Sequence, residues 1–575
     1  MKGWSGYDVF SLVAVVLLAI VTWPGTYSLS FAPKYAVMLL IGAVGLPVAV
    51  RQARSASGVA PMQRLLWGFL LIALISTVLS ADPAIGFFGA YGWGTGWLFL
   101  VGCVSAFALG SIVRVERIDA FACAFIIGGI INVLVSLEQA LGSSTNAALQ
   151  PYMGGQVLGL FANPVYYEMF LVGCIALTMY YACTHSYWWI GATALLTLGV
   201  ELSGERLAII IIAALCVIAL VRYGWYKSLR FIAPAIIGYG LGYATKYIHT
   251  NAGNTSSRLT NVAAGSYSTR FHIWTTSFRY FLYNLPLGTG PGQAFDLSSF
   301  ISRTVAHGLQ ERLVMDAHNI FVQTAITTGL LGIALFLAFW LLVIRYARGP
   351  FVGAFLAMML VQLIEPMNLG STVLLFLAAG LAVAHRTQAE PTSFISHKAW
   401  SYIVTGATAI LTAAALVLGI TLVVGDIDIQ NSAYMGTASY AAASAADRLL
   451  PFWPHTADDI SQLLGTESAI VADPYWQDGA IAWEKAATRR FPQLPYHWVT
   501  LGNYYYAGGQ YPQALAAYKH SDAVYKWYAP GWIGQAQVYI KQHRYHQAAY
   551  CLAQASIAPS TTDLTTIQHL QKHIH

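Results

Sequence analysis

Apolar segments long enough to cross a lipid bilayer recur from the N-terminus to about residue 425. Polar connections separate them, and one long polar segment, residues 248–316, interrupts the series. The pattern predicts an all-α fold in which residues 1–425 form a polytopic membrane domain. The thirteen expected transmembrane helices span residues 7–24, 35–50, 64–80, 96–113, 118–141, 160–182, 187–203, 207–221, 231–247, 317–344, 350–366, 371–385 and 401–425.

Residues 426–575 are more polar, and they repeat at a spacing of 34 residues. The stretch from Trp498 to Tyr505 is similar to the first helix of a tetratricopeptide repeat, and Gly509 to Tyr518 supplies a turn and a second helix. We expect an α-helical repeat domain that either binds peptides and partners or serves as a passive support. The residues one period apart are Trp498 and Trp532, Tyr505 and Tyr539, Tyr511 and Tyr545, and Ala480, Ala514 and Ala548.

The composition excludes an ordinary soluble enzyme. Hydrophobic residues make up 57% of the chain, charged residues only 9%, and the mean hydropathy is +0.57. The net charge of +6 is dispersed among the connections, which argues against a nucleic-acid partner. The six cysteines have no metal-ligand spacing, and five lie in apolar segments, so we expect no bound metal and no disulfide framework. The first apolar segment has no small-residue cleavage site, so we expect no cleavable signal peptide.

Lysine and arginine mark one side of the predicted membrane domain. They gather in alternate connections, which the positive-inside rule assigns to the cytoplasm. The N-terminus then lies inside, while residues 248–316 and the repeat domain lie outside the cytoplasm. The residues that define the cytoplasmic side are Lys2, Arg51, Arg54, Arg64, Arg114, Arg117, Arg222, Lys227, Arg230, Arg345, Arg348, Arg386 and Lys398.

The outer segment 248–316 and its junction with the next helix carry the candidate chemistry. Cations outnumber acids there, and the motif Asp316-Ala-His318-Asn319 begins the following apolar segment. A titratable base beside guanidinium groups at a membrane surface suits chemistry on an anionic, lipid-borne substrate. The cations are Lys246, Arg258, Arg270, Arg279, Arg303 and Arg312, and the acids are Asp296, Glu311 and Asp316.

Each motif on the outer side also has a structural interpretation. Arginine suits a diphosphate because its planar fork stays charged and offers paired donors. The turn from Gly288 to Gly292 can bring backbone N–H groups close to a phosphate or sugar, although such a turn alone is a weak signal. Glycines on membrane helices usually permit close packing, and a tryptophan such as Trp274 usually anchors the interface. His318 can accept a proton near neutral pH, with His272 and His307 as rival bases.

These motifs together resemble the O-antigen ligase and polymerase superfamily over roughly residues 155–350. The resemblance rests on His318-Asn319 followed by Gly329 and Gly332, preceded by Arg270-x-x-x-Trp274 and a Pro-Leu-Gly-x-Gly turn. It implies a GT-C-like membrane fold and a glycosyltransferase that inverts the sugar without a metal or another cofactor. It also implies that Arg206 and Arg270 bind the donor diphosphate and that His318 activates the acceptor hydroxyl as base. We expect Asn319, Glu205, Asn163 and Asp316 to support these residues.

The sequence departs from the family pattern at two places. Glu205-Arg206 replaces the usual Ser-Arg, which puts a carboxylate beside a proposed phosphate ligand. Asn163-Pro164-Val165 lacks the second asparagine of an Asn-Pro-Asn pattern, for which Glu168 is a possible replacement. These departures leave Arg258 and Arg279 as alternative diphosphate ligands.

The expected activity is transfer of a glycan from undecaprenyl diphosphate to a hydroxyl group, in the bacterial cytoplasmic membrane. The repeat domain favours a protein or cell-surface acceptor that it recruits. A glycan polymerase is the alternative enzyme. A non-catalytic transporter or assembly scaffold for envelope polymers is the alternative outside catalysis, although mid-span charges, expected in a transporter, are few.

Overall fold

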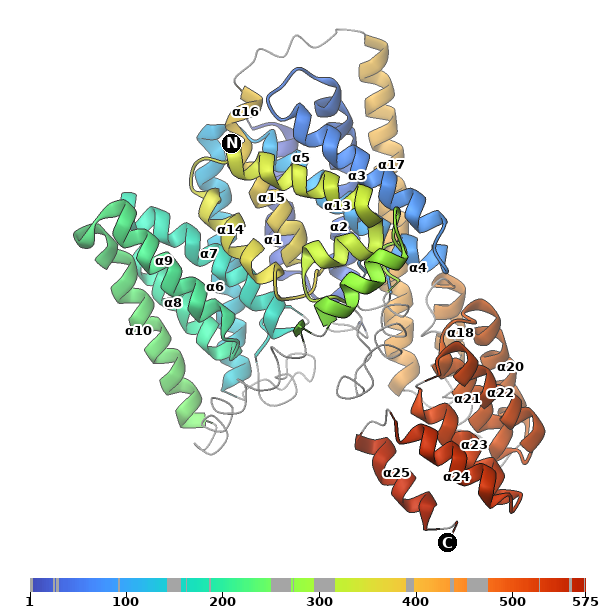
Figure 1. The fold of residues 1–575 in the computed structure, drawn as a ribbon. Helices are drawn as coiled ribbons and strands as arrows, with labels where there is room; N and C mark the ends of the chain where they lie inside the picture. The colour runs from blue at the N-terminus through green and yellow to red at the C-terminus, as the bar shows by residue number, and fades with distance from the viewer. Residues whose placement is uncertain are drawn as a thin grey trace. The chain divides into compact units, whose positions relative to one another are not determined.

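The computed structural model is built from helices throughout its described residues, which confirms the all-α prediction (Figure 1). It describes the chain apart from residues 1–3, 24–25, 27–29, 91–93, 142–156, 162, 186–187, 250–269, 272, 294–315, 389–397, 435–438, 452–473, 527, 558–560, 573 and 575. The chain divides into two compact units. The membrane unit consists of Met1–Arg270, Asn284–Gly292 and His318–Val423, and the repeat unit of Phe271–Tyr283, Gln293–Ala317 and Val424–His575.

Each range predicted as a transmembrane segment overlaps a long helix of the structure. These helices are α1 (Gly6–Ile20), α2 (Phe31–Arg54), α3 (Ala60–Val78), α5 (Trp97–Ser111), α6 (Ile118–Ala140), α7 (Pro164–Thr184), α8 (Trp189–Ser203), α9 (Leu207–Tyr223), α10 (Trp225–His249), α13 (Ile320–Tyr346), α14 (Phe351–Gln362), α15 (Ser371–Val383) and α17 (Lys398–Tyr434). Three short helices connect them: α4 (Pro83–Phe88), η1 (Val115–Arg117) and α16 (His385–Gln388).

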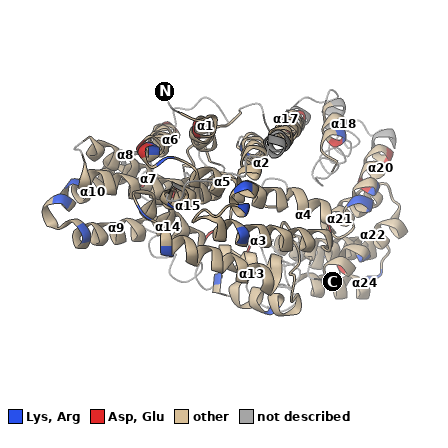
Figure 2. Ribbon diagram, turned by 90° about the horizontal axis from the view of Figure 1, so that it is seen from above, with Lys and Arg blue, Asp and Glu red and all other residues tan. Residues whose placement is uncertain are grey.

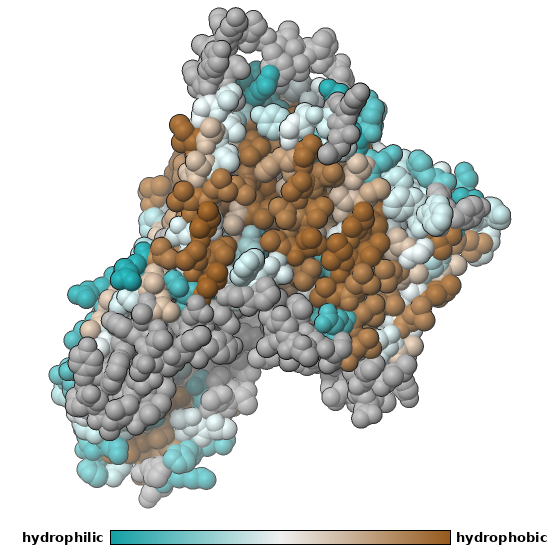
Figure 3. Space-filling view, turned by 180° about the vertical axis from the view of Figure 1, so that it is seen from behind, coloured by the Kyte–Doolittle hydropathy of each residue, from teal (hydrophilic) through white to brown (hydrophobic). Residues whose placement is uncertain are grey.

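The multi-pass membrane character is evident from the helices themselves. Six segments of the described chain are long and apolar enough to cross a bilayer: α2, α3, η1 with α6, α7, α13 and residues Thr405–Ile429 of α17. Shorter apolar helices are α1, α5, α8, α9, α14 and α15. Few charged residues interrupt the ribbon (Figure 2), and a broad apolar surface covers the face seen in Figure 3. The predicted number of thirteen crossings stays a prediction.

Helix α17 continues to Tyr434, beyond the expected end at residue 425. The segment Gly425-Asp-Ile-Asp-Ile429 contains no proline, so the helix continues after its apolar part ends. The apolar pattern thus marks the membrane portion of a helix that is longer than that portion.

Small residues bring helices of the membrane unit into close contact. A Cβ at Gly110 of α5 would collide with the carbonyl of Leu377 in α15, and one at Gly380 would collide with the carbonyl of Phe107. A Cβ at Gly238 of α10 would likewise meet the carbonyl of Ala194 in α8. Since lipid tails are as apolar as the side chains, close backbone packing of this kind stabilises helix pairs in membranes.

The repeat unit contains α18 (Ser439–Leu449), α20 (Pro474–Arg490), α21 (Pro495–Ala507), α22 (Tyr511–Val524), α23 (Ala529–Lys541), α24 (Tyr545–Ala555) and α25 (Thr561–Gln571). Helices α21 and α22 begin 34 residues before α23 and α24, from Pro495 to Ala529 and from Tyr511 to Tyr545. Ala480, Ala514 and Ala548 are fully buried. The predicted tetratricopeptide-like helix pairs are therefore confirmed.

Candidate active site

Two consecutive residues with different backbone roles form the start of α13. His318 lies in the left-handed region with φ of 50°, which residues other than glycine rarely adopt. Asn319 is the N-cap, and its Oδ1 accepts hydrogen bonds from the N–H groups of Phe321 and Val322 at 2.9 and 3.1 Å. Its Nδ2 donates to the carbonyl of Leu363 at 2.9 Å. Asn319 therefore ties the backbone at His318 to the segment that follows α14.

That segment brings a carboxylate beside His318. Glu365 forms an ion pair with Arg270, in which Nη2 of the guanidinium donates to Oε1. Its other oxygen, Oε2, lies 3.7 Å from Nδ1 of His318. The Glu365 side chain is 9% exposed, Arg270 is 22% exposed and His318 is 32% exposed. One largely shielded carboxylate thus connects the guanidinium and the imidazole that the sequence analysis singled out.

Arg270 begins a helix that covers residues 270–271 and 273–283. Among the described residues, Glu365 is its only hydrogen-bond acceptor, so the other N–H groups of the guanidinium are available to a bound anion. Trp274 lies about one helical turn further along, and its indole N–H donates to the carbonyl of Ala317 at 2.9 Å. The Arg-x-x-x-Trp motif therefore supplies an anion-binding group and a hydrogen bond to the residue before His318.

Arg206 is the N-cap residue of α9, immediately before its first turn. The N–H of Ala208 in that turn donates to the buried carboxylate of Glu168 on α7. A carboxylate at a helix N-terminus satisfies free N–H groups and interacts favourably with the helix dipole. Asn163 caps α7 itself by accepting from the N–H of Val165 at 2.9 Å. Asn163 thus fixes the start of α7, and Glu168 on that helix holds the start of α9, where Arg206 lies.

The charges of Glu205, Glu365 and Arg270 act on the carboxyl of Glu168. The junction of α7 and α9 therefore lies near the Arg270–Glu365 pair, although the residues are far apart in sequence. Ionisable groups are costly within a membrane protein and generally mark a functional site. We name the residues Glu168, Glu205, Arg270, His318 and Glu365 the polar cluster.

The glycine-rich turn has a structural role. Helix α13 is interrupted at Gly329, where φ is 65° and ψ is −165°. The N–H groups of Thr289 and Gly290 donate to the carbonyls of Ile326 and Thr327 at 3.1 and 2.9 Å, next to this interruption. A Cβ at Gly329 would collide with the carbonyl of Pro286, in the same segment as the turn.

These contacts correct the suggestion that the turn presents its backbone to a phosphate. The N–H groups of Thr289 and Gly290 are occupied by carbonyls of α13 that the helix interruption leaves without helical partners. The packing interpretation of Gly329 is the one that the structure supports.

The other predicted site residues differ in their surroundings. Arg279 is exposed and forms no ion pair with any described residue, whereas Asp316 is 3% exposed. Arg258 and the rival bases His272 and His307 lie outside the described residues.

Glu365 is a residue of the polar cluster that the sequence motifs did not reveal. The signal available was a single acidic residue at the end of the apolar segment 350–366, since an ionisable residue in such a segment is a functional candidate by default. The contact of Glu365 with His318 at the start of α13 has no local sequence signal, because the two positions are 47 apart in the chain (365 − 318).

The polar cluster combines two chemical capacities. An imidazole beside a carboxylate can accept a proton and stabilise the resulting charge, as in hydrolase triads. A guanidinium with available donors can bind phosphate oxygens in pairs. Within the described part of the chain, no group of three or more His, Cys, Asp or Glu side chains could hold a metal ion.

Comparison with known proteins agrees with the sequence resemblance. Residues 191–337 match the family model described as O-Antigen ligase, a range that contains Arg206, Arg270 and His318. The predicted family resemblance is thus confirmed over this region, and it supports a glycosyltransferase of the O-antigen ligase or polymerase type. Glu365 lies beyond the matched range.

No curated protein matches the chain. Among solved structures, the chain is similar to one described as the APC/C hetero-tetramer Cut9-Hcn1, with a TM-score of 0.24 and 11% identity over 82% of this chain and 76% of that one. It is also similar to yeast Tom70, with a TM-score of 0.28 and 12% identity over 79% of this chain and 96% of that one.

Proposed function

We propose that the protein transfers a glycan from undecaprenyl diphosphate to a hydroxyl group of a protein or cell-surface acceptor. The observation that carries this proposal is the contact of one carboxylate, Glu365, with both Arg270 and His318, two residues that lie within the range 191–337 matched by the O-antigen ligase family model. The distribution of lysine and arginine supports placing this site on the outer side of a bacterial cytoplasmic membrane.

In the proposed reaction, the acceptor oxygen attacks the anomeric carbon while the bond from that carbon to the diphosphate oxygen breaks. The proton of the acceptor hydroxyl passes to His318, and the negative charge leaves with the undecaprenyl diphosphate. Attack from the face opposite the leaving group inverts the anomeric centre. Because diphosphate is already a good leaving group, the protein has mainly to position the partners and stabilise the departing charge.

Each residue of the polar cluster has a role in this scheme. Glu365 orients the imidazole and stabilises its cationic form, as a carboxylate does for the base of a hydrolase triad. Arg270 binds the diphosphate through the N–H groups that Glu365 does not occupy, and Arg206 binds it from the start of α9. Glu168 holds that helix end in place. No step in this scheme requires a metal ion.

The repeat unit supports a macromolecular acceptor, since arrays of helical repeats commonly provide extended binding surfaces. A glycan polymerase would use the same polar cluster with a second lipid-linked glycan as acceptor. The two activities differ in the molecule that accepts the glycan, so a labelled donor distinguishes them by the product that carries the label.

The test is incubation of the purified protein with undecaprenyl diphosphate carrying a radiolabelled glycan. Acceptors are offered separately: envelope proteins, cell-surface polymer and unlabelled lipid-linked glycan. The proposal expects label in protein or polymer, with equal rates in the presence and absence of EDTA. Label only in longer lipid-linked glycans would identify a polymerase. Absence of transfer to every acceptor, or strict dependence on a divalent metal, would contradict the proposed reaction.

A further inference from the structure

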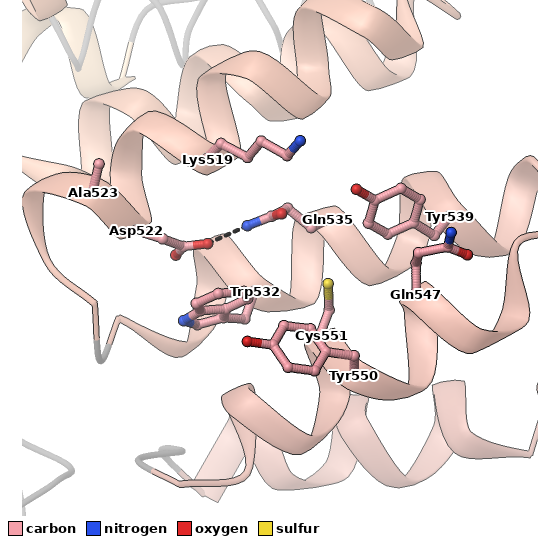
Figure 4. A pocket seen from close by; sticks show the side chains of 9 residues that line it. All are labelled: Lys519, Asp522, Ala523, Trp532, Gln535, Tyr539, Gln547, Tyr550 and Cys551. Atoms are coloured by element: carbon pink, nitrogen blue, oxygen red, sulfur yellow. Dashed lines mark hydrogen bonds between the residues drawn. The ribbon is translucent and has the colours of Figure 1, made fainter.

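The repeat unit contains a cavity of about 440 Å³ between α22 and α24, with α23 as its floor (Figure 4). This volume lies in the range typical of small-ligand sites. Aromatic rings form part of its wall, where the centroids of Trp532 and Tyr550 are 6.1 Å apart and nearly perpendicular. Lys519 and Tyr550 are exposed at its opening, so the cavity can be reached from solvent.

The inner end of the cavity carries a buried polar pair. Gln535 donates through Nε2 to Oδ2 of Asp522, and these residues are 3% and 8% exposed. The second oxygen of Asp522 has no hydrogen-bond partner among the described residues. Burial raises the pKa of Asp522 to about 8, against the hydrogen bond from Gln535, which lowers it. At neutral pH this carboxyl is therefore largely protonated, and it can both donate and accept.

Comparison of residues 34 positions apart shows which residues of the cavity lining belong to the common repeat scaffold and which occur only at this cavity. Lys485, Trp498 and Tyr505 occupy the equivalent places one repeat earlier and match Lys519, Trp532 and Tyr539. The indoles of both tryptophans donate to the carbonyl six residues before them, at 2.8 and 2.7 Å. These residues therefore belong to the common scaffold.

The polar pair and the exposed tyrosine do not repeat. The positions equivalent to Asp522 and Gln535 hold Thr488 and Leu501, and the position equivalent to Tyr550 holds Ala516. The preceding repeat forms its helix pair without these three residues, with His497 at the place of Gly531, which lies against Oδ1 of Asp522 here. A buried carboxyl with an unsatisfied oxygen costs stability, so a ligand is the more direct reason for its presence.

We propose that this cavity binds a saccharide unit, an inference that rests on the proposed glycan-transfer function. The C–H face of a sugar ring packs on the rings of Trp532 and Tyr550. Its hydroxyl or acetamido groups exchange hydrogen bonds with Asp522 and Gln535 and accept a hydrogen bond from Lys519.

The chemistry of the lining favours a sugar over an apolar side chain or a lipid tail. A sugar ring presents a weakly polar face together with a rim of groups that both donate and accept. Tyrosine and tryptophan offer large apolar faces with little conformational entropy to lose. A protonated carboxyl and an amide also both donate and accept, so they match hydroxyl groups without a net charge. A purely apolar ligand would leave the buried Asp522–Gln535 pair without a polar partner in the cavity.

The saccharide has two possible sources, and the experiment separates them. The full-length protein in nanodiscs is immobilised, and glycans labelled with 2-aminobenzamide are passed over it. One arm uses glycans released by mild acid from the lipid-diphosphate pool of the source cells, and the other uses glycans from their surface polymer. A third arm uses a labelled peptide library.

Three of the substitutions introduce the residue found at the equivalent position of the preceding repeat, so we expect these variants to fold correctly. Tyr550→Ala introduces the residue found at position 516, and Asp522→Thr with Gln535→Leu introduces those found at 488 and 501. Trp498→Ala is the matched control for Trp532→Ala, since both indoles make the same backbone hydrogen bond. Circular dichroism of each variant checks that the repeats remain folded.

We expect the wild-type protein and Trp498→Ala to retain glycan in at least one glycan arm. Tyr550→Ala, Trp532→Ala and the double variant should reduce retention at least tenfold. No retention by the wild-type protein in either glycan arm, or equal retention by the folded variants, would overturn the inference. Retention of peptides alone would identify a peptide site instead. His318→Ala should retain glycan like the wild-type protein, so failure of transfer and failure of this cavity remain distinguishable.

Discussion

Oε2 of Glu365 lies 3.7 Å from Nδ1 of His318, while Oε1 of the same carboxylate pairs with Arg270. His318 is thus part of an acid–base pair and not an isolated base. The ion pair with Arg270 fixes the position of this carboxylate beside the imidazole. Glu365 therefore couples the proposed proton acceptor to the proposed diphosphate-binding group.

Replacement of Glu365 by glutamine should lower kcat by about 10²-fold, because the neutral amide cannot stabilise a charged imidazole. KM for the lipid-linked donor should change less, since Arg270 keeps its charge. The measurement is the transfer rate at saturating and limiting donor. Glu116→Gln, in the exposed turn η1, is the control and should behave like the wild-type protein. Unchanged kcat in Glu365→Gln would exclude a role of this carboxylate in proton transfer.

Arg270→Lys should weaken donor binding and transfer by at least tenfold although it preserves the charge. Lysine offers a point charge, whereas the guanidinium can contact Glu365 and two phosphate oxygens together. Arg279→Lys is the matched control, since Arg279 lies on the same helix, is exposed and has no ion-pair partner among the described residues. Binding is measured with the radiolabelled donor in nanodiscs. Equal affinity in both variants would show that Arg270 does not bind the diphosphate.

Substitution of Gly329 by alanine should destabilise the membrane unit and reduce transfer. The φ of 65° is unfavourable for alanine by roughly 1–2 kcal/mol, and the added Cβ would also collide with the carbonyl of Pro286. The melting temperature in detergent, followed by circular dichroism, should fall by several degrees. Gly191→Ala in α8 meets no atom within 4 Å, so it should leave the melting temperature unchanged or raise it. A normal melting temperature for Gly329→Ala would contradict the interruption of α13.

The stability of the repeat unit should fall as the pH rises. Burial raises the pKa of Asp522 to about 8, whereas an unfolded aspartate ionises near about 4. Between these values the folded state holds a proton that the unfolded state has released, so stability decreases from about pH 4 to about pH 8. Lys519 and Cys551 also line the cavity, and both stay unchanged in Asp522→Asn, the variant that tests this prediction.

The measurement is hydrogen exchange of residues 511–555 at pH 5 and pH 8, corrected for the intrinsic exchange rate. Protection in the wild-type protein should decrease at pH 8 more than in Asp522→Asn, whose side chain does not titrate. The same loss of protection in both proteins would assign the pH dependence to another group.

The sequence predicted the helices better than their contacts. Each predicted apolar segment overlaps a long helix, and the recurrence of Trp498 at Trp532 predicted the helical repeats. Both signals are local or strictly periodic. The sequence also placed His318-Asn319 at the start of a helix, where Asn319 is now seen as the N-cap. Length and apolarity alone did not predict that α17 extends to Tyr434.

Interactions between distant helix ends were not predictable in the same way. The pairing of Arg270 with Glu365 joins residues 95 positions apart, and no periodicity in a single sequence reports such a contact. The turn from Gly288 to Gly292 was ambiguous for a related reason. Glycine permits close approach of any backbone or ligand, and only the position of the interrupted α13 shows that Thr289 and Gly290 contact its carbonyls.

His318 acts as the base of the proposed glycan transfer at the polar cluster, and the variant His318→Asn tests this role. Asparagine tolerates the left-handed backbone at this position, so the variant removes the base with little added strain. The measurement is the single-turnover rate of transfer from radiolabelled undecaprenyl-diphosphate glycan, together with the Kd for that donor. We expect a transfer rate lower by about 10²–10⁴-fold with a Kd close to that of the wild-type protein. A near-normal transfer rate would contradict it.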